Sequence, residues 1–478
     1  MAKKRVAKPK SGHGSGESAA SMASMPYFLS LELENVRCFG ERQVLDLSDG
    51  QGRPARWTIL LGENGTGKTT ILQCATIVDN WYSKNSRAAN LGQDVRLTPE
   101  ASSLAKYFAR GVGRSPAKIS ARLALVTHGL GSLSRSTRTE KYEIELDPRH
   151  GGARFGQSES LGIATFCCAY GAGRRLGSTS LSSSSWSATS SSSVRMDVDD
   201  ADVRTQSLFS DVADLLDAEE WLLRIDYSAS KPSELQETQR RLRDQVKRLL
   251  VDLLPDVHEI RFNASSGVIP KPGVEFRTSF GWVSLRQLGY GYQSMIAWLV
   301  DFGSRMVEQY PDSPDPFTQP ALVLIDEIDL HLHPRWQRHL IRFLTERFPN
   351  TQFIATAHSP LIVQSASGGN IALLRCEGDQ IVIENDIKTI RGWRIDQILT
   401  SDLFGIESAR PPEFDSDLAR RKELLTKPEL TASDNEELER LESKIGLLPS
   451  GETFEQAKTM MLIEKSLKDL KAKIRGKS

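Results

Sequence analysis

The chain has 478 residues and a mass of 53.1 kDa, enough for about three ordinary domains or one large elaborated domain. Its 61 Lys and Arg balance its 61 Asp and Glu, so any polyanion site must be local. No run of 18 apolar residues occurs, and the basic start leads into Gly and Ser rather than an apolar signal core. Five cysteines, few and odd in number, indicate free thiols in a reducing compartment. These features predict a cytoplasmic protein without a membrane partner.

The beginning of the chain predicts a tail followed by strands. Five Lys and Arg stand among Gly, Ser and Ala with almost nothing to bury, so we expect a disordered basic tail over residues 1–26. Alternating apolar residues predict a one-sided antiparallel sheet over 118–147, and a crossover helix is expected over 335–348. Further strands are predicted at 27–36, 44–47, 57–61, 321–325, 352–355, 371–374 and 381–383.

Three further segments have distinct compositions. The Ser-rich residues 177–194 predict a mobile loop. Helical spacing of Leu and Val predicts a helix over 233–254, and one face of it is strongly basic. That face consists of Arg240, Arg241, Arg243, Lys247 and Arg248. A solvated helix surface explains it, and a nucleic-acid contact is the alternative. After about residue 400 the sequence is charged and helical, with helices expected at 435–445 and 454–474.

A phosphate-binding loop is predicted at residues 62–69, which read Gly-Glu-Asn-Gly-Thr-Gly-Lys-Thr. The segment lies between an apolar strand and a helix, the context that the P-loop pattern requires. Its glycines allow backbone N–H groups and the helix N-terminus to face an anion. Lys68 would reach the β and γ phosphates of ATP, and the Thr69 hydroxyl would bind Mg²⁺. The residues predicted to hold ATP in this loop are Gly62, Asn64, Gly65, Gly67, Lys68, Thr69 and Thr70.

Two carboxylates, Asp326 and Glu327, follow the apolar strand predicted at 321–325. We expect Asp326 to hold the metal together with Thr69, and Glu327 to polarise the water that attacks the γ phosphate. A helix N-cap would explain an isolated acidic pair equally well, but the P-loop favours the catalytic interpretation. The predicted catalytic residues are therefore Lys68, Glu327 and one histidine, described next.

Histidines are the remaining candidate site residues. His358 follows the strand predicted at 352–355, and α/β sheets carry their ligand chemistry at such strand ends, so we expect it to contact the γ phosphate. His331, His333 and His339 invite a metal interpretation, because His-x-His can chelate. No Cys lies near them, and a turn after the acidic pair explains the segment better.

Taken together, these motifs resemble the ABC-type ATPases of the RecF, SMC and OLD-like group. The segments that carry the resemblance are 33–40, 62–69, 288–293, 326–334 and 357–360. The resemblance implies an α/β fold: a P-loop head with a mixed sheet, an antiparallel β lobe, a helical insertion and a helical C-terminal tail. It implies a head over 27–400 with an insertion at about 90–280, and leaves 401–478 as a helical region that docks a partner or a second copy.

In this family two heads enclose two ATP molecules, each between the P-loop of one copy and the signature loop of the other. The corresponding segment here is Leu288-Gly289-Tyr290-Gly291, in which Gly289 stands where the family usually has Ser. The resemblance thus implies that Gly289 and Gly291 contact ATP held by a second copy, in a homodimer or a higher even oligomer. Loss of the Ser hydrogen bond predicts slow ATP hydrolysis.

The segments 170–174, 207–209 and 218–222 narrow the resemblance to compact bacterial ATPases linked to phage defence, of the Septu and retron-associated type. Arg174 is interpreted there as a phosphate-contacting or coupling residue. The implied function is an ATP-hydrolysing switch that controls a partner nuclease or the engagement of DNA. A RecF-like repair or clamp ATPase and a nucleotide-sensing scaffold are the alternatives. Asp415 and Asp417 have the spacing of a nuclease motif, but their surroundings lack strand character.

Overall fold

The computed structural model describes much of the chain. The described residues are 25–90, 106–110, 115–127, 135–147, 152–156, 165–177, 203–264, 272–366, 368–385, 390, 392–406, 408–427 and 430–445. Residues 1–24 of the expected tail, 178–194 of the Ser-rich loop and the helix expected at 454–474 therefore lie outside them. The chain divides into two compact units, Met1–Ile395 and Asp396–Ser478.

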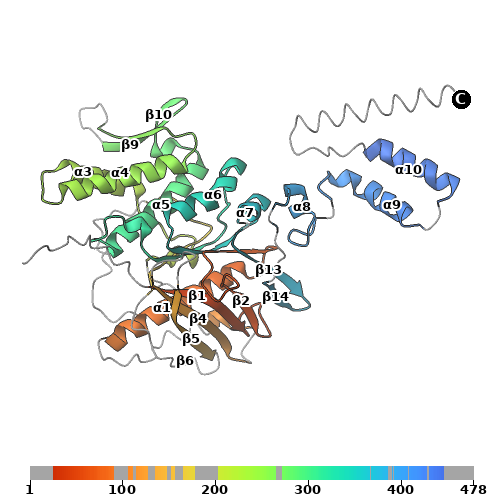
Figure 1. Cartoon of the computed structure of the whole chain (residues 1–478), viewed down its shortest axis with the longest axis horizontal. Helices are drawn as coiled ribbons and strands as arrows, with labels where there is room; N and C mark the ends of the chain where they lie inside the picture. The colour runs from red at the N-terminus through yellow and green to blue at the C-terminus, as the bar shows by residue number, and fades with distance from the viewer. Residues whose placement is uncertain are drawn as a thin grey trace, which may run out of the picture. The chain divides into compact units, whose positions relative to one another are not determined.

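The first unit is built around a six-stranded mixed sheet in the order β14-β13-β3-β12-β11-β7. Figure 1 labels two of its strands, β13 and β14. Neighbouring strands from β13 to β7 are parallel, and β14 pairs antiparallel with β13 at the edge. The strands are β3 (Trp57–Gly62), β7 (Cys167–Tyr170), β11 (Ala321–Ile325), β12 (Thr351–Thr356), β13 (Asn370–Glu377) and β14 (Gln380–Glu384). Every residue of β11 and β12 is buried, as a parallel sheet covered on both faces requires.

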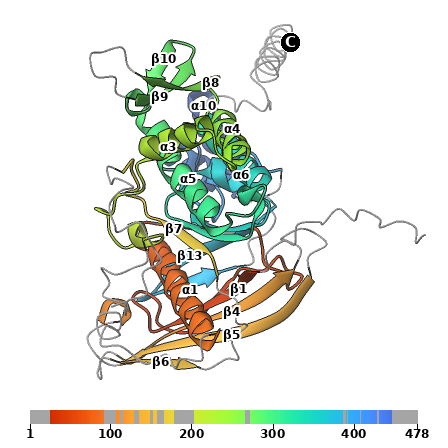
Figure 2. The same cartoon turned by 90° about the vertical axis from the view of Figure 1, so that its left-hand side faces the viewer.

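A second, antiparallel sheet has the order β2-β1-β4-β5-β6. Its strands are β1 (Met25–Glu34), β2 (Gln43–Asp46), β4 (Ala117–Thr127), β5 (Arg135–Asp147) and β6 (Gly152–Gly156). The antiparallel pairing predicted over 118–147 is confirmed, because β4 and β5 form a long ladder. Helix α1 (Lys68–Asn90) contacts strands of both sheets, so it lies between them (Figure 2). The P-loop connects β3 of the mixed sheet to this helix.

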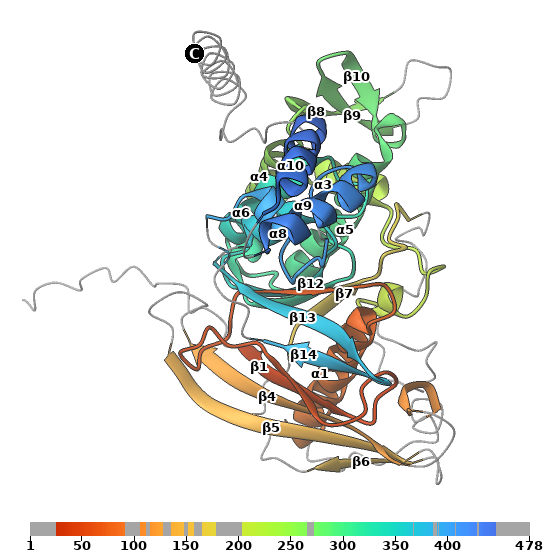
Figure 3. The same cartoon turned by 90° about the vertical axis from the view of Figure 1, so that its right-hand side faces the viewer.

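Helices cover the other face of the mixed sheet, where Figure 3 shows α5 and α6 on the side away from α1. The helices of this region are α3 (Ala218–Ser230), α4 (Gln236–Leu253), α5 (Tyr290–Gln309), α6 (Pro334–Arg347) and α7 (Pro360–Ser365). The predicted crossover helix is α6, and Pro334 and a hydrogen bond from the Arg335 N–H to the His333 side chain define its start. A three-stranded sheet was not predicted; it contains β8 (Glu259–Ala264), β9 (Pro272–Thr278) and β10 (Gly281–Ser284).

A buried charged cluster fixes α5 against the mixed sheet. The Arg305 guanidinium donates to both carboxylate oxygens of Asp301, at 2.6 and 3.0 Å, and the Tyr170 hydroxyl donates to the same carboxylate at 2.9 Å. All three side chains are buried, so the charges satisfy each other rather than water. Because Tyr170 ends β7, the cluster ties α5 to the strand that neighbours β11.

The second unit contains α9 (Asp415–Leu425) and α10 (Ala432–Ile445), and α8 (Ile395–Leu399) crosses into it. Arg420 forms a paired hydrogen bond with Glu437 at 3.0 and 2.9 Å, which joins α9 to α10. The helix expected at 435–445 is confirmed as part of α10. Asp415 and Asp417 lie in the first turn of α9, which agrees with their lack of strand character.

All five cysteines are free thiols, as predicted. No helix among the described residues is both long and apolar enough to cross a membrane.

Candidate nucleotide-binding site

The predicted P-loop connects β3 to α1, and glycine is required at two of its positions. Gly62 and Gly67 have φ angles of 148° and 83°, which side chains with a Cβ rarely adopt. A Cβ on Gly67 would also lie 2.5 Å from the Cys38 sulfur, and one on Gly62 would lie 2.7 Å from the Leu374 carbonyl oxygen. The loop therefore takes a shape that only this glycine pattern allows.

Lys68 begins α1 and folds back over the loop. Its Nζ donates to the carbonyl oxygens of Gly62 and Glu63, both at 2.8 Å. Burial lowers the pKa of Lys68, while Asp326 and Glu327 act in the opposite direction. The ammonium is thus held in place by weak neutral acceptors that a phosphate oxygen could replace.

A cavity of about 390 Å³ opens beside this loop. It brings together most of the predicted ATP, metal and catalytic residues; those that line it are Asn64, Gly65, Gly67, Lys68, Thr69, Thr70, Asp326, Glu327 and His358. Gly62 contributes its carbonyl oxygen to Lys68 rather than lining the cavity. Segments separated by more than 250 residues in the sequence therefore meet at one site, as the P-loop and acidic-pair hypothesis requires.

Asp326 is the centre of a short hydrogen-bond chain. The Thr69 hydroxyl donates to one oxygen of its carboxylate and the Thr356 hydroxyl donates to the other, both at 2.6 Å. The Thr356 hydroxyl also accepts the Glu327 N–H at 2.6 Å. Asp326 is only 6% exposed, so these bonds fix its carboxylate. A hydroxyl and a carboxylate facing each other are oxygen ligands that suit Mg²⁺, so the residues fit the predicted metal.

Arg174 supports the acidic pair from behind. The guanidinium is 2% exposed and donates to the carbonyl oxygens of Asp326 at 2.5 Å, Glu327 at 2.6 Å and Gly171 at 3.0 Å. Burial lowers its pKa to about 10, so it stays charged at neutral pH. Glu327 has a left-handed backbone with φ 49°, an unfavourable conformation that these bonds help to hold. Arg174 does not line the cavity, which corrects its interpretation as a phosphate contact and retains the coupling interpretation.

The His358 segment is positioned through its backbone. Its N–H donates to the Asp329 carboxylate at 2.9 Å, and the next residue, Ser359, caps α7 by accepting the Leu361 N–H. The Ser359 hydroxyl in turn donates to Gln337 of α6 at 2.6 Å. His358 therefore reaches the cavity from a turn that is tied to the acidic-pair segment and to α6.

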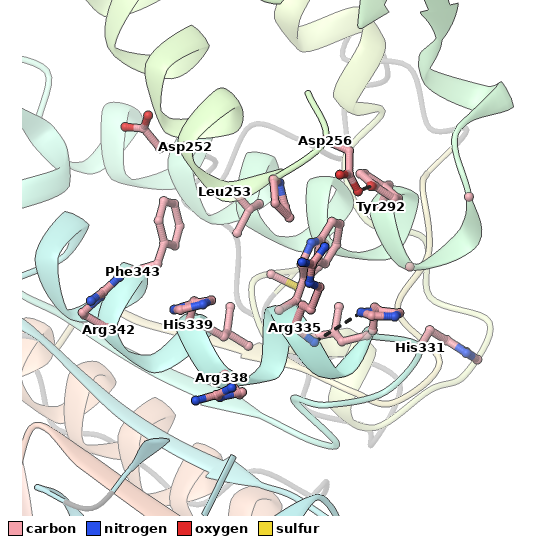
Figure 4. A pocket seen from close by; sticks show the side chains of 18 of the residues that line it. Asp252, Leu253, Asp256, Tyr292, His331, Arg335, Arg338, His339, Arg342 and Phe343 are labelled. Carbon is pink, nitrogen blue, oxygen red and sulfur yellow. Dashed lines mark hydrogen bonds between the residues drawn. The ribbon is translucent and has the colours of Figure 1, made fainter. Parts of the chain in front are cut away.

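Gly289 and Gly291 lie elsewhere in the chain. Together with His331, His333 and His339 they line a separate cavity of about 980 Å³, shown in Figure 4. Gly291 packs against the His331 backbone so closely that a Cβ would overlap the carbonyl oxygen. Gly289 is the N-cap of α5, and a Cβ there would have no atom nearer than 3.7 Å. One copy of the chain thus does not bring its own signature segment to its own P-loop.

Three residues were not predicted as site residues: Arg37 and Cys38, which line the P-loop cavity, and Thr356, which bonds to the acidic pair without lining the cavity. Arg37 donates to the Thr70 hydroxyl and to Gln73, both at 3.3 Å, and its guanidinium lies 3.9 Å from the centre of the Tyr107 ring. It stands in the segment 33–40 and Thr356 immediately precedes Ala357-His358, so both were close to recognised motifs. Only the folded contacts show what they bond to.

Two family models match separate parts of the chain. Residues 30–161 match a family described as "AAA domain", and residues 187–364 match one described as "AAA domain, putative AbiEii toxin, Type IV TA system". A Septu protein PtuA from Bacillus mycoides is 25% identical over 87% of this chain and 50% of its own length. A Retron Ec83 probable ATPase from Escherichia coli is 36% identical over 27% of this chain and 23% of its own length.

The chain therefore spans about half the length of the first of these relatives, and the matched part of the second is shorter still. Among solved structures, the SMC head domain from Thermotoga maritima aligns with 76% of this chain and 99% of its own at 13% identity and a TM-score of 0.38. The resemblance to ATPases of the Septu and retron-associated type is confirmed by these relatives, and the predicted α/β fold with mixed and antiparallel sheets is confirmed by the structure.

Proposed function

We propose that the chain is a slow ATPase switch whose P-loop cavity binds ATP and whose closed state is a dimer with ATP at the interface. The observation that carries this proposal is the convergence of Lys68, Thr69, Asp326 and Glu327 on one cavity from distant parts of the sequence. A Gly-rich turn without nucleotide would need neither the acidic pair nor the threonine bonds that fix it.

In this proposal each residue has a distinct role. The P-loop backbone and Lys68 bind the phosphates, while Thr69 and Asp326 would hold Mg²⁺. When bound, Mg²⁺ neutralises phosphate charge. Glu327 orients and polarises the attacking water, and His358 contacts the γ phosphate from the neighbouring strand. Arg174 stays outside the reaction and fixes the backbone that carries Asp326 and Glu327.

The position of Gly289 and Gly291 supports a dimer. They line a different cavity from the P-loop residues, so a second copy is needed to bring a signature segment over bound ATP. Such an arrangement makes ATP part of the interface, and hydrolysis would release it. Following the resemblance to Septu and retron-associated ATPases, we propose a nuclease as the controlled partner, with residues 401–478 as the docking region.

The test is the oligomeric state of the full chain in magnesium with ATP, with ADP and without nucleotide, measured by light scattering after size exclusion. We expect Glu327→Gln to bind ATP, to hydrolyse it far more slowly and to accumulate the larger species. Glu237→Gln, an exposed change on α4, is the matched control and should behave as the unmodified chain. ATP uptake without any change in size would contradict the dimer.

Turnover separates the switch from a scaffold. ATP hydrolysis by the unmodified chain above that of Glu327→Gln supports the switch, whereas equal rates favour a nucleotide-sensing scaffold. The neighbouring reading frame is informative about the partner, because an HNH or Toprim protein favours nuclease control and replication or repair genes favour a RecF-like role.

A further inference from the structure

The cavity beside the signature segment extends well beyond Gly289 and Gly291. It is bounded by the C-terminal end of α4, the first turns of α5 and most of the length of α6 (Figure 4). At about 980 Å³ it is larger than the 390 Å³ cavity at the P-loop. The proposed ATPase cycle uses only the part of this cavity lined by Gly289 and Gly291. The remainder, here called the α6 groove, has no assigned role.

Three arginines give the α6 groove its charge. Arg335, Arg338 and Arg342 all line it, and their spacing of three and four residues places them along one side of the helix. At 1.5 Å of rise per residue, the stripe spans about 10.5 Å. Figure 4 shows Arg338 and Arg342 projecting from α6, with Arg338 on the side opposite Phe343.

Few carboxylates of the described chain neutralise the charges of these arginines. Arg335 and Arg338 are exposed and form no ion pair with any residue that the structure describes. Arg342 lies 3.9 Å from Glu346, with both side chains about 70% exposed, so solvent screens that pair. The groove therefore presents a row of cations that are free to take anionic ligands.

Three carboxylates line the groove: Glu346 lies on α6 beside Arg342, and the other two lie on the opposite wall, where both are engaged. Asp252, at the end of α4, pairs with Arg347. Asp256 accepts a hydrogen bond from the Tyr292 hydroxyl at 2.7 Å, as Figure 4 shows. Their charges are thus committed to neighbours, and an anion would meet the α6 side first.

Aromatic side chains line the same space. The Tyr292 and Trp336 rings pack edge to face with centroids 4.4 Å apart, and the bond to Asp256 fixes the Tyr292 ring further. Trp336 is buried, whereas Tyr292 and Phe343 are half-buried and offer ring surface to a ligand. A row of cations beside rigid rings is the combination with which proteins bind single-stranded nucleic acid, phosphates on the cations and bases on the rings.

We propose that the α6 groove binds a single strand of nucleic acid. Phosphates lie along Arg335, Arg338 and Arg342, whose span is about 10.5 Å. A base packs on Tyr292, whose ring lies against Trp336, the residue next to Arg335. A duplex keeps its base faces stacked inside, so the ring contacts favour a single strand. Binding here needs no ATP, so its test does not depend on the proposed ATPase cycle.

The experiment is fluorescence anisotropy of the full chain without nucleotide, using a labelled oligo(dT) of about 20 nucleotides, longer than the ~4–16 nucleotides of known single-strand sites. Affinity is measured across a salt series. The test variant combines Arg335→Ala, Arg338→Ala and Arg342→Ala. The matched control removes the same charge from α4 with Arg240→Ala, Arg241→Ala and Arg248→Ala, which lie outside the groove.

Each phosphate contact on a single strand contributes about 0.7 to the slope of log affinity against log salt, so the test variant should lower the slope by about 2. The control triple should keep the slope of the unmodified chain. Tyr292→Leu should weaken binding about fivefold or more without changing the slope, because stacking is not ionic. Thermal unfolding and ATP affinity of every variant show whether it is folded.

Several results would overturn the proposal. If the triple variants of α4 and α6 lose the same amount of oligo(dT) affinity, the loss reflects the overall charge of the chain rather than the groove. The groove would belong to a different ligand if the chain binds duplex DNA more tightly than oligo(dT). The same conclusion would follow if polyglutamate competes as well as nucleic acid does, or if a mononucleotide competes at the same phosphate concentration. Absence of measurable oligo(dT) binding at low salt would reject it outright.

Discussion

Two threonines of β12 allow the bonds of the acidic pair to be tested with one kind of substitution. Thr356 and Thr351 are both 0% exposed. The Thr356 hydroxyl bridges the Asp326 carboxylate and the Glu327 N–H, whereas the Thr351 hydroxyl has no hydrogen-bond partner among the described residues. Valine replaces each hydroxyl by a methyl group of similar size, so the two variants differ mainly in the bonds that are lost.

The expected magnitudes follow from these contacts. Thr356→Val leaves the Glu327 N–H without its acceptor and the Asp326 carboxylate without one of its donors. A hydrogen bond to a charged group contributes about 1.5–3 kcal/mol, and an unsatisfied buried group costs about 1–3 kcal/mol. Because one hydroxyl makes both bonds, we expect the free energy of unfolding to fall by about 2–4 kcal/mol. Thr351→Val removes a buried hydroxyl without a partner, so stability should hold or rise by up to about 1 kcal/mol.

Urea unfolding followed by tryptophan fluorescence measures both effects, and Trp57, stacked on Phe353 at 4.3 Å, reports on the same sheet. Calorimetry with ATP and magnesium should show weaker binding for Thr356→Val alone, because Asp326 loses a fixed orientation. Equal stability and equal ATP affinity in the two variants would refute the claim that Thr356 organises the acidic pair.

Three further predictions concern other parts of the site. A serine fits at position 289, since the nearest atom to its Cβ is 3.7 Å away, so Gly289→Ser should raise the rate of ATP hydrolysis by up to about tenfold if the family's hydrogen bond is restored. The control variant Gly291→Ser would overlap the His331 carbonyl oxygen and should instead unfold more readily. Arg174→Lys keeps the charge but loses the fork that holds three carbonyls, so turnover should fall about tenfold or more while ATP affinity changes little, and an unchanged rate would exclude a positioning role. Burial lowers the pKa of Lys68 below its usual 10.5. As the pH rises through that lowered pKa, the ammonium loses its proton and the affinity for ATP should decline. An ATP affinity that titration calorimetry finds unchanged up to about pH 10.5 would contradict this.

The parts of the fold that the sequence predicted are those with strong local signals. β11 is a continuous apolar run, β12 carries the shorter run Phe353-Ile354-Ala355, and the P-loop glycines adopt backbone angles that other residues avoid. The acidic pair lies beside the P-loop because it follows β11, whose carboxyl end lies at the same edge of the parallel sheet as that of β3, with β12 between them. The strand and the P-loop can be predicted because each depends on a few adjacent residues, and a continuous apolar run is typical of a buried parallel strand.

The unpredicted parts depend on contacts between distant residues. Arg174 was singled out through the resemblance as a phosphate-contacting or coupling residue, but only the fold shows its three carbonyl partners. The sheet of β8, β9 and β10 alternates polar and apolar residues over short strands, and its order becomes evident only when α3 and α4 cover its buried face. Polar side chains with several possible partners are poorly specified by local sequence.

The acidic-pair segment and the signature segment are mechanically linked within one chain. His331 has a left-handed backbone with φ 61°, its carbonyl packs on Gly291, and its ring lies edge to face against Tyr290 at 4.7 Å. The same segment begins at Glu327, whose N–H and carbonyl are held by Thr356 and Arg174. A shift of the acidic pair during hydrolysis would therefore move the signature segment that, in the proposed dimer, faces the ATP of the other copy. Since His331 also borders the α6 groove, a strand bound there would restrict the same movement, so the affinity for ATP and the affinity for nucleic acid should change each other by the same factor.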